Sequence, residues 1–273
     1  MNNDLKRKKL FVLDMDGTIY LGDRLFAGTS RFLKAVNEKG GRCIFMTNNS
    51  SKSAGDYVGK LSKMGIKAGI SDFVTSADAS VWFLKKKLGS DFRKKKMYVM
   101  GTASLIKQMK EEGFRVADEA GEDIELILCG FDRELTYRKL EDVCRMLSEK
   151  PGLPYYATNP DWVCPTEFGY VPDCGSMCKM IEKATGRSPV FIGKPQPLMA
   201  LLAMEITGFS QEETLVVGDR LYTDIACGYN AGVETCFVLS GEGTMEDLES
   251  SEVKPTYVFT DINQLYRRIK DET

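Results

Sequence analysis

Two acidic residues, separated by one residue, follow a short apolar segment near the start of the chain. Residues 10–13 have the length and composition of a buried strand, and Asp14 and Asp16 come directly before Gly17 and Thr18. Carboxylates at the end of a buried strand are costly unless a cation, a reacting phosphorus atom or hydrogen bonds use them. The pattern predicts that Asp14 is a nucleophile, that Asp16 donates and accepts a proton, and that a magnesium ion lies beside them.

Three further apolar segments end in polar residues with useful chemistry. These residues are Thr47 and Asn48 after residues 43–46, Lys194 after residues 190–192, and Asp219 after residues 214–217. In folds built on parallel strands, ligands gather at the carboxyl ends of the strands. We therefore expect these side chains to meet Asp14 and Asp16 at one edge of a sheet.

Such a group of side chains suits attack on a phosphate ester. A carboxylate that attacks an anionic phosphate needs positive charge around the transferring oxygens. Lys194 supplies one positive charge, and Mg²⁺ held by hard oxygen ligands supplies more. Suitable ligands are the carboxylates of Asp14 and Asp219 and the backbone carbonyl of Asp16. Asp224, near the start of a helix, could orient Lys194 or the metal site.

The remaining roles concern the phosphate and the protons. We expect Thr47, Asn48 and Lys194 to bind the substrate phosphate. Asp16 can protonate the leaving oxygen and then activate water against an aspartyl phosphate on Asp14.

The composition excludes several other mechanisms and partners. The chain has no His, which rules out a Ser-His-Asp triad, a Cys-His dyad and a His phosphocarrier. Its eight Cys form no CxxC pair, so we expect reduced thiols rather than a zinc site. The net charge of -2 indicates no nucleic-acid partner. No apolar run approaches the roughly 18 residues of a membrane span, so we expect no membrane partner and a cytoplasmic location.

Strands and helices alternate along the whole chain, which predicts an α/β fold with parallel sheets and helices on both faces. Further strands are expected over residues 235–239 and 257–259. Between Thr47 and Lys194 lie 146 residues, far more than the core needs. We expect a core formed by residues 1–78 and 189–273 and an inserted domain over residues 79–188. Within the insert, a loop rich in Pro and Gly is expected before a helix over residues 177–185.

Four segments, in this order, resemble the motifs of the haloacid dehalogenase superfamily. They are Asp14-Met15-Asp16-Gly17-Thr18, Thr47-Asn48-Asn49, Gly193-Lys194-Pro195, and Gly218-Asp219-Arg220 with Thr223-Asp224. The chain most closely resembles the NagD/p-nitrophenylphosphatase branch, and the resemblance covers nearly all of it. It implies a Rossmann-like parallel-sheet core with an inserted α/β cap. It also implies Mg²⁺-dependent hydrolysis of small phosphomonoesters, such as sugar phosphates or nucleotides, through an aspartyl phosphate. Asp219 would then bind the metal, with Asp224 in its outer shell.

The resemblance assigns substrate selection to the cap. The cap signature is matched by Asn159-Pro160-Asp161, Pro165 and Gly169, whereas Asp173-Cys174-Gly175-Ser176-Met177 replaces a more glycine-rich turn. The candidate specificity residues are Asn159, Asp161, Cys174, Gly175 and Ser176. The expected partner is a small phosphomonoester, and the resemblance allows a homodimer formed through the cap.

Other functions agree less well with these residues. A dehalogenase of the same superfamily needs the nucleophile but no acid at position 16, and a mutase would carry a small helical cap soon after Asp14. A receiver-like phosphate sensor is much smaller than 273 residues. A non-catalytic metabolite-binding relative would be expected to lose Asp14 or Asp16. The sequence thus favours a phosphatase and leaves its substrate open among sugar phosphates, nucleoside monophosphates, phosphoglycolate and pyridoxal phosphate.

Overall fold

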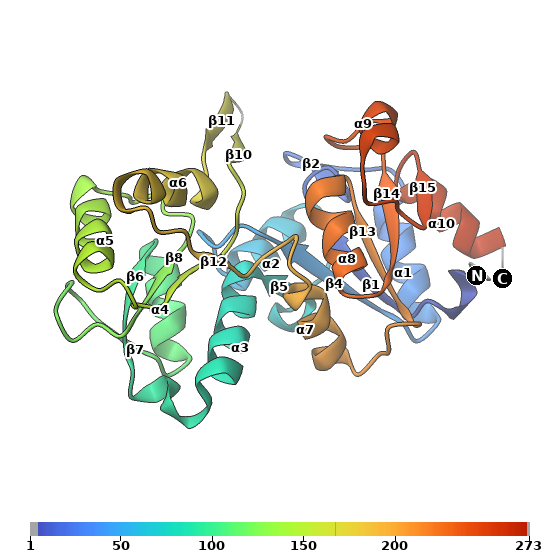
Figure 1. Cartoon of the computed structure of the whole chain (residues 1–273). Helices are drawn as coiled ribbons and strands as arrows, with labels where there is room; N and C mark the ends of the chain where they lie inside the picture. The colour runs from blue at the N-terminus through green and yellow to red at the C-terminus, as the bar shows by residue number, and fades with distance from the viewer. Residues whose placement is uncertain (1–4, 167, 272–273) are drawn as a thin grey trace. The chain divides into compact units, whose positions relative to one another are not determined.

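The computed structural model describes residues 5–166 and 168–271, and the chain forms two compact units (Figure 1). The first unit contains the chain up to Thr47, the segment Ala54–Val74 and the chain from Lys194 onward. The second unit contains Asn48–Ser53 and Thr75–Gly193. The predicted α/β fold with a parallel-sheet core is confirmed by the first unit.

The first unit is built on a six-stranded sheet with the order β15-β14-β13-β1-β4-β5. The strands are β1 (Leu10–Asp14), β4 (Arg42–Thr47), β5 (Phe73–Thr75), β13 (Thr214–Gly218), β14 (Glu234–Val238) and β15 (Tyr257–Phe259). β1 runs parallel to both of its neighbours, β13 and β4. The first four residues of β1 are buried apolar side chains, as expected for a strand that is covered on both faces.

Helices cover both faces of this sheet. α1 (Thr29–Glu38), α2 (Ala54–Lys63) and α10 (Ile262–Asp271) share one hydrophobic core with alternate residues of β1 and β13. Phe32 of α1, for example, meets Phe11 of β1 edge to face, with ring centroids 5.1 Å apart. α7 (Leu198–Thr207) and α8 (Ala226–Asn230) pack on the strands from the other side.

Short elements complete the first unit. They are the hairpin of β2 (Tyr20–Leu21) and β3 (Arg24–Leu25), the 3₁₀ turns η1 (Leu5–Arg7) and η2 (Ile70–Asp72), the π-helical turn η4 (Leu221–Ile225), and α9 (Met245–Ser250). The hairpin follows β1 directly, and η4 follows β13, so both extend the chain beyond the carboxyl ends of core strands.

The second unit has its own parallel sheet, with the order β12-β9-β8-β6-β7. Its strands are β6 (Lys96–Met100), β7 (Arg115–Val116), β8 (Leu126–Cys129), β9 (Tyr155–Ala157) and β12 (Val190–Phe191). Its helices are α3 (Ser76–Leu88), the 3₁₀ turn η3 (Gly89–Arg93), α4 (Ala103–Glu111), α5 (Tyr137–Glu149) and α6 (Cys174–Thr185). α5 and α6 share a hydrophobic core with β6, β8 and β9.

Two sequence predictions were wrong in this part of the chain. The strand before Lys194 was expected in the core sheet, but it is β12, in which Val190 pairs with Tyr156 of the second unit's sheet. The loop expected before residue 177 contains an antiparallel hairpin of β10 (Val163–Thr166) and β11 (Gly169–Pro172). It also contains the start of α6, whose N-cap is Asp173.

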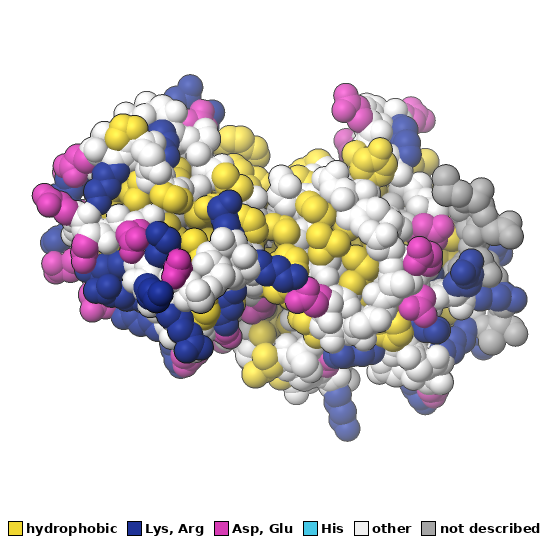
Figure 2. Space-filling model, turned by 60° about the horizontal axis from the view of Figure 1, so that its bottom comes forward, with side chains coloured by type: hydrophobic (Ala, Val, Ile, Leu, Met, Phe, Trp, Pro, Cys, Tyr) yellow, Lys and Arg dark blue, Asp and Glu magenta, His cyan; other side chains and the backbone are white. Residues whose placement is uncertain are grey.

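Charge and helix composition bear on possible partners. On the face shown in Figure 2, acidic and basic side chains are interspersed, in keeping with the net charge of -2. Among the described residues, no helix combines the length and the apolar character needed to span a membrane. The eight cysteines are free thiols.

Candidate active site

The carboxyl ends of three neighbouring strands bring distant parts of the sequence to one edge of the core sheet. Asp14, the last residue of β1, pairs in register with Met46 of β4, so Thr47 lies one residue beyond it. β13, on the other side of β1, ends at Gly218, and Asp219 follows. Asp14, Thr47 and Asp219 therefore lie at the same edge.

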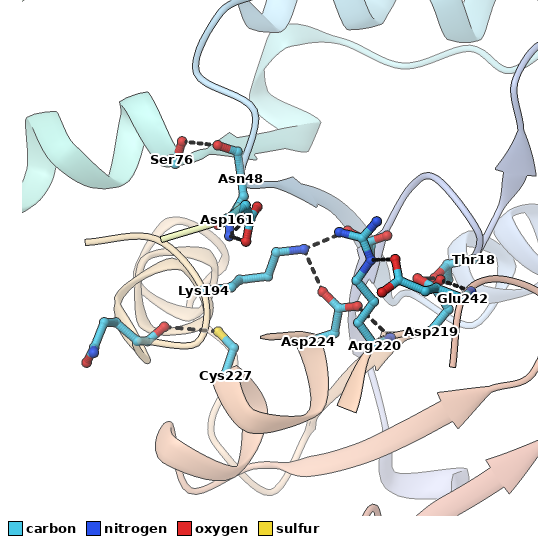
Figure 3. Close-up of polar contacts among 12 residues, drawn as sticks. Thr18, Asn48, Ser76, Asp161, Lys194, Asp219, Arg220, Asp224, Cys227 and Glu242 are labelled. Atoms are coloured by element: carbon cyan, nitrogen blue, oxygen red, sulfur yellow. Dashed lines mark hydrogen bonds and ion pairs between the residues drawn. The ribbon is translucent and has the colours of Figure 1, made fainter. Parts of the chain in front are cut away.

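Lys194 reaches Asp14 from the segment that leads into α7, and not from a core strand. The residue is buried, and its Nζ lies 2.6 Å from Oδ1 of Asp14. The same Nζ lies 2.6 Å from Oδ1 of Asp224 (Figure 3). Burial lowers the pKa of the Lys194 ammonium group, but the charges of Asp14 and Asp224 outweigh burial and raise it. Lys194 is therefore a fixed positive charge between two carboxylates.

Asp14, Asp219 and Asp224 form a cluster of carboxylates. One oxygen from each lies within 4.8 Å of the other two. Burial, followed by the charge of Asp224, raises the pKa of Asp14 well above its ordinary value and that of Asp219 to about 6. Crowded, buried carboxylates favour a cation between them, and an all-oxygen set of donors suits a hard divalent ion such as Mg²⁺. These residues thus fit the predicted metal.

Both oxygens of Asp224 accept hydrogen bonds from the protein. Oδ1 accepts the Lys194 ammonium group, and Oδ2 accepts the backbone N–H of Arg220 at 3.1 Å. Asp224 is buried, so these bonds hold it firmly. This arrangement suits a residue that orients Lys194.

Asp16 is the exception to the expectation of two buried carboxylates, because its side chain is exposed. Enough protein still surrounds the carboxyl group that burial raises its pKa, against the opposing charges of Lys60 and Arg220. A raised pKa helps a carboxyl group to hold a proton, and exposure lets it meet an incoming molecule. The position of Asp16 thus agrees with acid/base chemistry.

Comparisons with known proteins identify the family. Residues 11–115 match a family model described as haloacid dehalogenase-like hydrolase, and residues 191–265 match a second one described as HAD-hydrolase-like. The acid sugar phosphatase of Staphylococcus aureus (strain MRSA252) is 34% identical over 260 residues, which are 95% of this chain and 97% of that protein. The chain belongs to the haloacid dehalogenase-like hydrolases.

Solved structures of relatives agree with this assignment. A 4-nitrophenylphosphatase from Thermotoga maritima is 41% identical, with a TM-score of 0.89 and coverage of 97% of this chain and 98% of that chain. A glycerol phosphate phosphatase from Mycobacterium tuberculosis, solved in complex with magnesium, is 29% identical, with a TM-score of 0.89 and coverage of 98% and 79%. The predicted NagD/p-nitrophenylphosphatase branch and the enzyme class, a phosphatase, are confirmed.

In this haloacid dehalogenase-like hydrolase, Asn48 belongs to the second unit. Its side-chain Nδ2 donates to Oδ1 and Oδ2 of Asp161, at 3.2 and 3.0 Å, and its backbone carbonyl accepts the hydroxyl of Ser76 at 2.6 Å (Figure 3). Asn48 was predicted to bind phosphate and Asp161 to select the substrate. The structure joins these two residues to each other.

Asn159 and Cys174 are fully buried in the second unit. Nδ2 of Asn159 donates to Oδ1 of Asp173 at 3.0 Å, and the same oxygen accepts the backbone N–H of Cys174. These bonds join the end of β9 to the start of α6. Neither residue offers a surface to a ligand in this structure, so an influence on selectivity would have to act through packing.

Gly175 and Ser176 lie in the first turn of α6 and contact the segment 160–162. A Cβ on Gly175 would lie 2.1 Å from the backbone oxygen of Pro160, so the position has room only for glycine. Ser176 donates its hydroxyl to the backbone carbonyl of Trp162. Of the five cap candidates, Asp161 and Ser176 are the ones that are not buried.

One segment at the site was not among the residues predicted from sequence. The backbone N–H of Glu242 donates to Oδ2 of Asp219 at 2.7 Å, and Ser240 donates its hydroxyl to the carbonyl of Gly17 at 2.7 Å. A signal was available, because these residues follow the strand expected over residues 235–239. Its carboxyl end lies at the same edge of the sheet, since β14 runs parallel to β13.

Proposed function

We propose that this phosphatase hydrolyses small phosphomonoesters, such as sugar phosphates or nucleotides, with Mg²⁺ and through an aspartyl phosphate on Asp14. The observation that carries the proposal is the bond of 2.6 Å from the Lys194 ammonium group to Asp14, next to the carboxylates of Asp219 and Asp224. This arrangement combines a nucleophile, a fixed positive charge and a set of oxygen ligands. These are the parts that phosphoryl transfer to a carboxylate needs.

In the first step, an oxygen of Asp14 attacks phosphorus. Lys194 binds Oδ1 and so orients the carboxylate, which leaves Oδ2 to form the new bond to phosphorus. The bond from phosphorus to the ester oxygen breaks, and that oxygen takes the proton held by Asp16. Thr47, at the end of β4, donates its hydroxyl to the phosphoryl oxygens. Asn48 was the second predicted donor, but its side-chain amide donates to Asp161 in this structure.

In the second step, water cleaves the aspartyl phosphate. Asp16, now a carboxylate, takes a proton from water while the water oxygen attacks phosphorus. The bond between phosphorus and Asp14 breaks, which releases inorganic phosphate and restores both carboxyl groups. The exposed position of Asp16 gives water access to it.

Mg²⁺, when bound, neutralises charge on the transferring phosphoryl group. The carboxylates of Asp14 and Asp219 and the backbone carbonyl of Asp16 would hold it. Asp224 would orient Lys194 from the outer shell, which agrees with the two hydrogen bonds that its oxygens accept. The magnesium complex of the mycobacterial relative supports this choice of metal.

We assign catalysis to the core, expected over residues 1–78 and 189–273, and substrate selection to the cap over residues 79–188. The exposed side chains near the cap hairpin, among them Trp162 and Tyr170, are available for selective contacts. The homodimer and the cytoplasmic location remain predictions.

The test is phosphate release by the full chain from p-nitrophenyl phosphate and a panel of phosphometabolites. We expect Mg²⁺ to support turnover, EDTA to abolish it, and Asp14→Asn to abolish it. Asp118→Asn, at an exposed acid of the second unit, is the control and should retain full activity. Turnover that withstands both EDTA and Asp14→Asn would contradict the proposal.

A further inference from the structure

We infer that Glu242 is a positioning residue for the divalent-cation site, which it serves by fixing the carboxylate of Asp219. The inference rests on the proposed function, because it concerns the cation that the phosphatase would use. Glu242 lies in the segment 240–243, which we call the collar, immediately after β14 and Leu239.

The collar holds Asp219 through its backbone. The N–H of Glu242 donates to Oδ2 of Asp219 at 2.7 Å, and the N–H of Gly243 donates to the backbone carbonyl of Asp219 at 3.1 Å. Ser240 donates to the carbonyl of Gly17 at 2.7 Å, which joins the collar to the turn that follows β1. The collar therefore contacts Asp219, a predicted metal ligand, and the turn that follows the strand of Asp14.

Glycines allow the collar and the turn after β1 to approach the carboxylate of Asp219 closely. A Cβ on Gly241 would lie 1.9 Å from Oδ2 of Asp219, and a Cβ on Gly17 would lie 2.4 Å from the same atom. The carboxylate is thus enclosed between two backbone segments. Its orientation depends on where those segments lie.

The side chain of Glu242 fixes the collar in this place. Its Oε2 lies 2.9 Å from Nε of Arg220, and its Oε1 accepts the hydroxyl of Tyr222 at 2.8 Å. The backbone N–H of Arg220 in turn donates to Asp224 at 3.1 Å. Glu242 therefore reaches Asp219 through its own backbone N–H, and its side chain reaches Asp224 through the ion pair with Arg220.

This geometry favours a positioning role over a ligand role or a purely stabilising one. The side chain of Glu242 is 45% exposed, and its carboxylate contacts Arg220 and Tyr222 rather than the acid cluster. An ion pair with that exposure contributes little to folding. Groups that orient a metal ligand, by contrast, change metal affinity by about 10- to 100-fold when they are removed.

The experiment measures Mg²⁺ affinity without turnover. The melting temperature of the full chain is followed as Mg²⁺ is titrated, for wild type, Glu242→Ala, Glu242→Gln and the control Glu249→Ala at an exposed acid of α9. We expect Glu242→Ala to weaken apparent Mg²⁺ affinity about 10-fold or more, with a metal-free melting temperature close to that of wild type. Glu242→Gln still accepts the hydroxyl of Tyr222, so its Mg²⁺ affinity should lie between those of wild type and Glu242→Ala. The Mg²⁺ affinity of Glu249→Ala should match that of wild type.

A second measurement separates an effect of the Glu242–Tyr222 contact from a general disturbance of the fold. Tyr222→Phe should weaken Mg²⁺ affinity in the wild-type background and have no further effect in Glu242→Ala, because the two residues act through one contact. Unchanged Mg²⁺ affinity in Glu242→Ala would overturn the inference, and so would a lower metal-free melting temperature with unchanged affinity. If wild type itself shows neither Mg²⁺-dependent stabilisation nor Mg²⁺-dependent turnover, the proposed function fails and the inference fails with it.

Discussion

Replacing Lys194 by Met tests whether the site is a buried charge cluster. Lys194 is the positive charge that bridges Asp14 and Asp224, and the side chains of all three are at most 14% exposed. Met has nearly the same length and no charge, so Lys194→Met leaves two buried carboxylates without their partner. Removing one partner of a buried ion pair costs about 3–5 kcal/mol of folding free energy.

Lys9 provides the matched control. Its Nζ lies 2.7 Å from Glu213, almost the same distance, but the two side chains are 51% and 30% exposed. Exposed pairs of this kind contribute about 0.2–1 kcal/mol. The two variants therefore break ion pairs of equal length in different surroundings, and burial alone should separate their effects.

Hydrogen–deuterium exchange of the peptides that cover β1 reports on the core sheet directly. In metal-free buffer, Lys194→Met should speed exchange in β1 by roughly 100- to 5,000-fold, since each 1.4 kcal/mol is a factor of ten. Peptides from β8 in the second unit serve as the internal reference. Lys9→Met should speed exchange in β1 by roughly fivefold at most.

The loss should also depend on pH. Burial raises the pKa of Asp14 in the folded protein, so the fold loses stability as the pH rises from the pKa of the unfolded chain towards that of the folded protein, where Asp14 ionises. In Lys194→Met this loss of stability is larger, because the positive charge beside Asp14 is gone. In wild type, Lys194 stays charged from pH 5 to pH 8 because its pKa is raised. The penalty of Lys194→Met should therefore grow from pH 5 to pH 8. Equal exchange in the two variants, or a penalty that does not change with pH, would refute the description of the site.

Two further predictions concern Asp219 and Gly17. Because burial and the charge of Asp224 raise the pKa of Asp219 to about 6, Asp219→Asn should raise the melting temperature of the metal-free protein at pH 8. It should not do so at pH 4, where the folded state keeps this carboxyl group protonated. Mg²⁺ should stabilise wild type and not this variant, and equal stabilisation of both would argue against Asp219 as a ligand. Gly17→Ala and Gly22→Ala both place a side chain at a positive φ, 87° and 60°, which costs about 1–2 kcal/mol each. Only Gly17→Ala also pushes a Cβ into Asp219, so it alone should lose Mg²⁺-dependent turnover in the phosphate-release assay, and equal losses would count against this contact.

The sequence was most informative where strand ends are neighbours in one sheet. Asp14, Thr47 and Asp219 could be grouped because β1, β4 and β13 are adjacent and parallel, so each ends at the same edge. The same rule wrongly placed the strand before Lys194 in the core sheet. That strand, β12, joins β9 instead, and apolar composition cannot show which sheet a strand joins, since pairing depends on distant parts of the chain.

The segment between Asp161 and residue 177 was misjudged for a different reason. Its Pro and Gly residues indicated a loop, but β10 and β11 form an isolated two-stranded hairpin, where strand edges tolerate Pro. The start of α6 at Cys174 could have been predicted, because Asp173 is a favourable N-cap residue. The exposure of Asp16 could not have been predicted, because the position of a residue beyond a strand end depends on the turn that follows.

The most direct test of the central claim is to trap the phosphoryl group on Asp14. The variant Asp16→Asn is mixed with p-nitrophenyl phosphate and Mg²⁺, because the nitrophenolate leaves without a proton whereas cleavage of the aspartyl phosphate needs the missing base. Acid quenching and borohydride reduction then convert an aspartyl phosphate to homoserine, and trypsin releases the peptide of residues 10–24. We predict homoserine at position 14, and none when the substrate is omitted. Nitrophenolate release with an unmodified peptide 10–24, or with the label on another residue, would contradict Asp14 as the nucleophile.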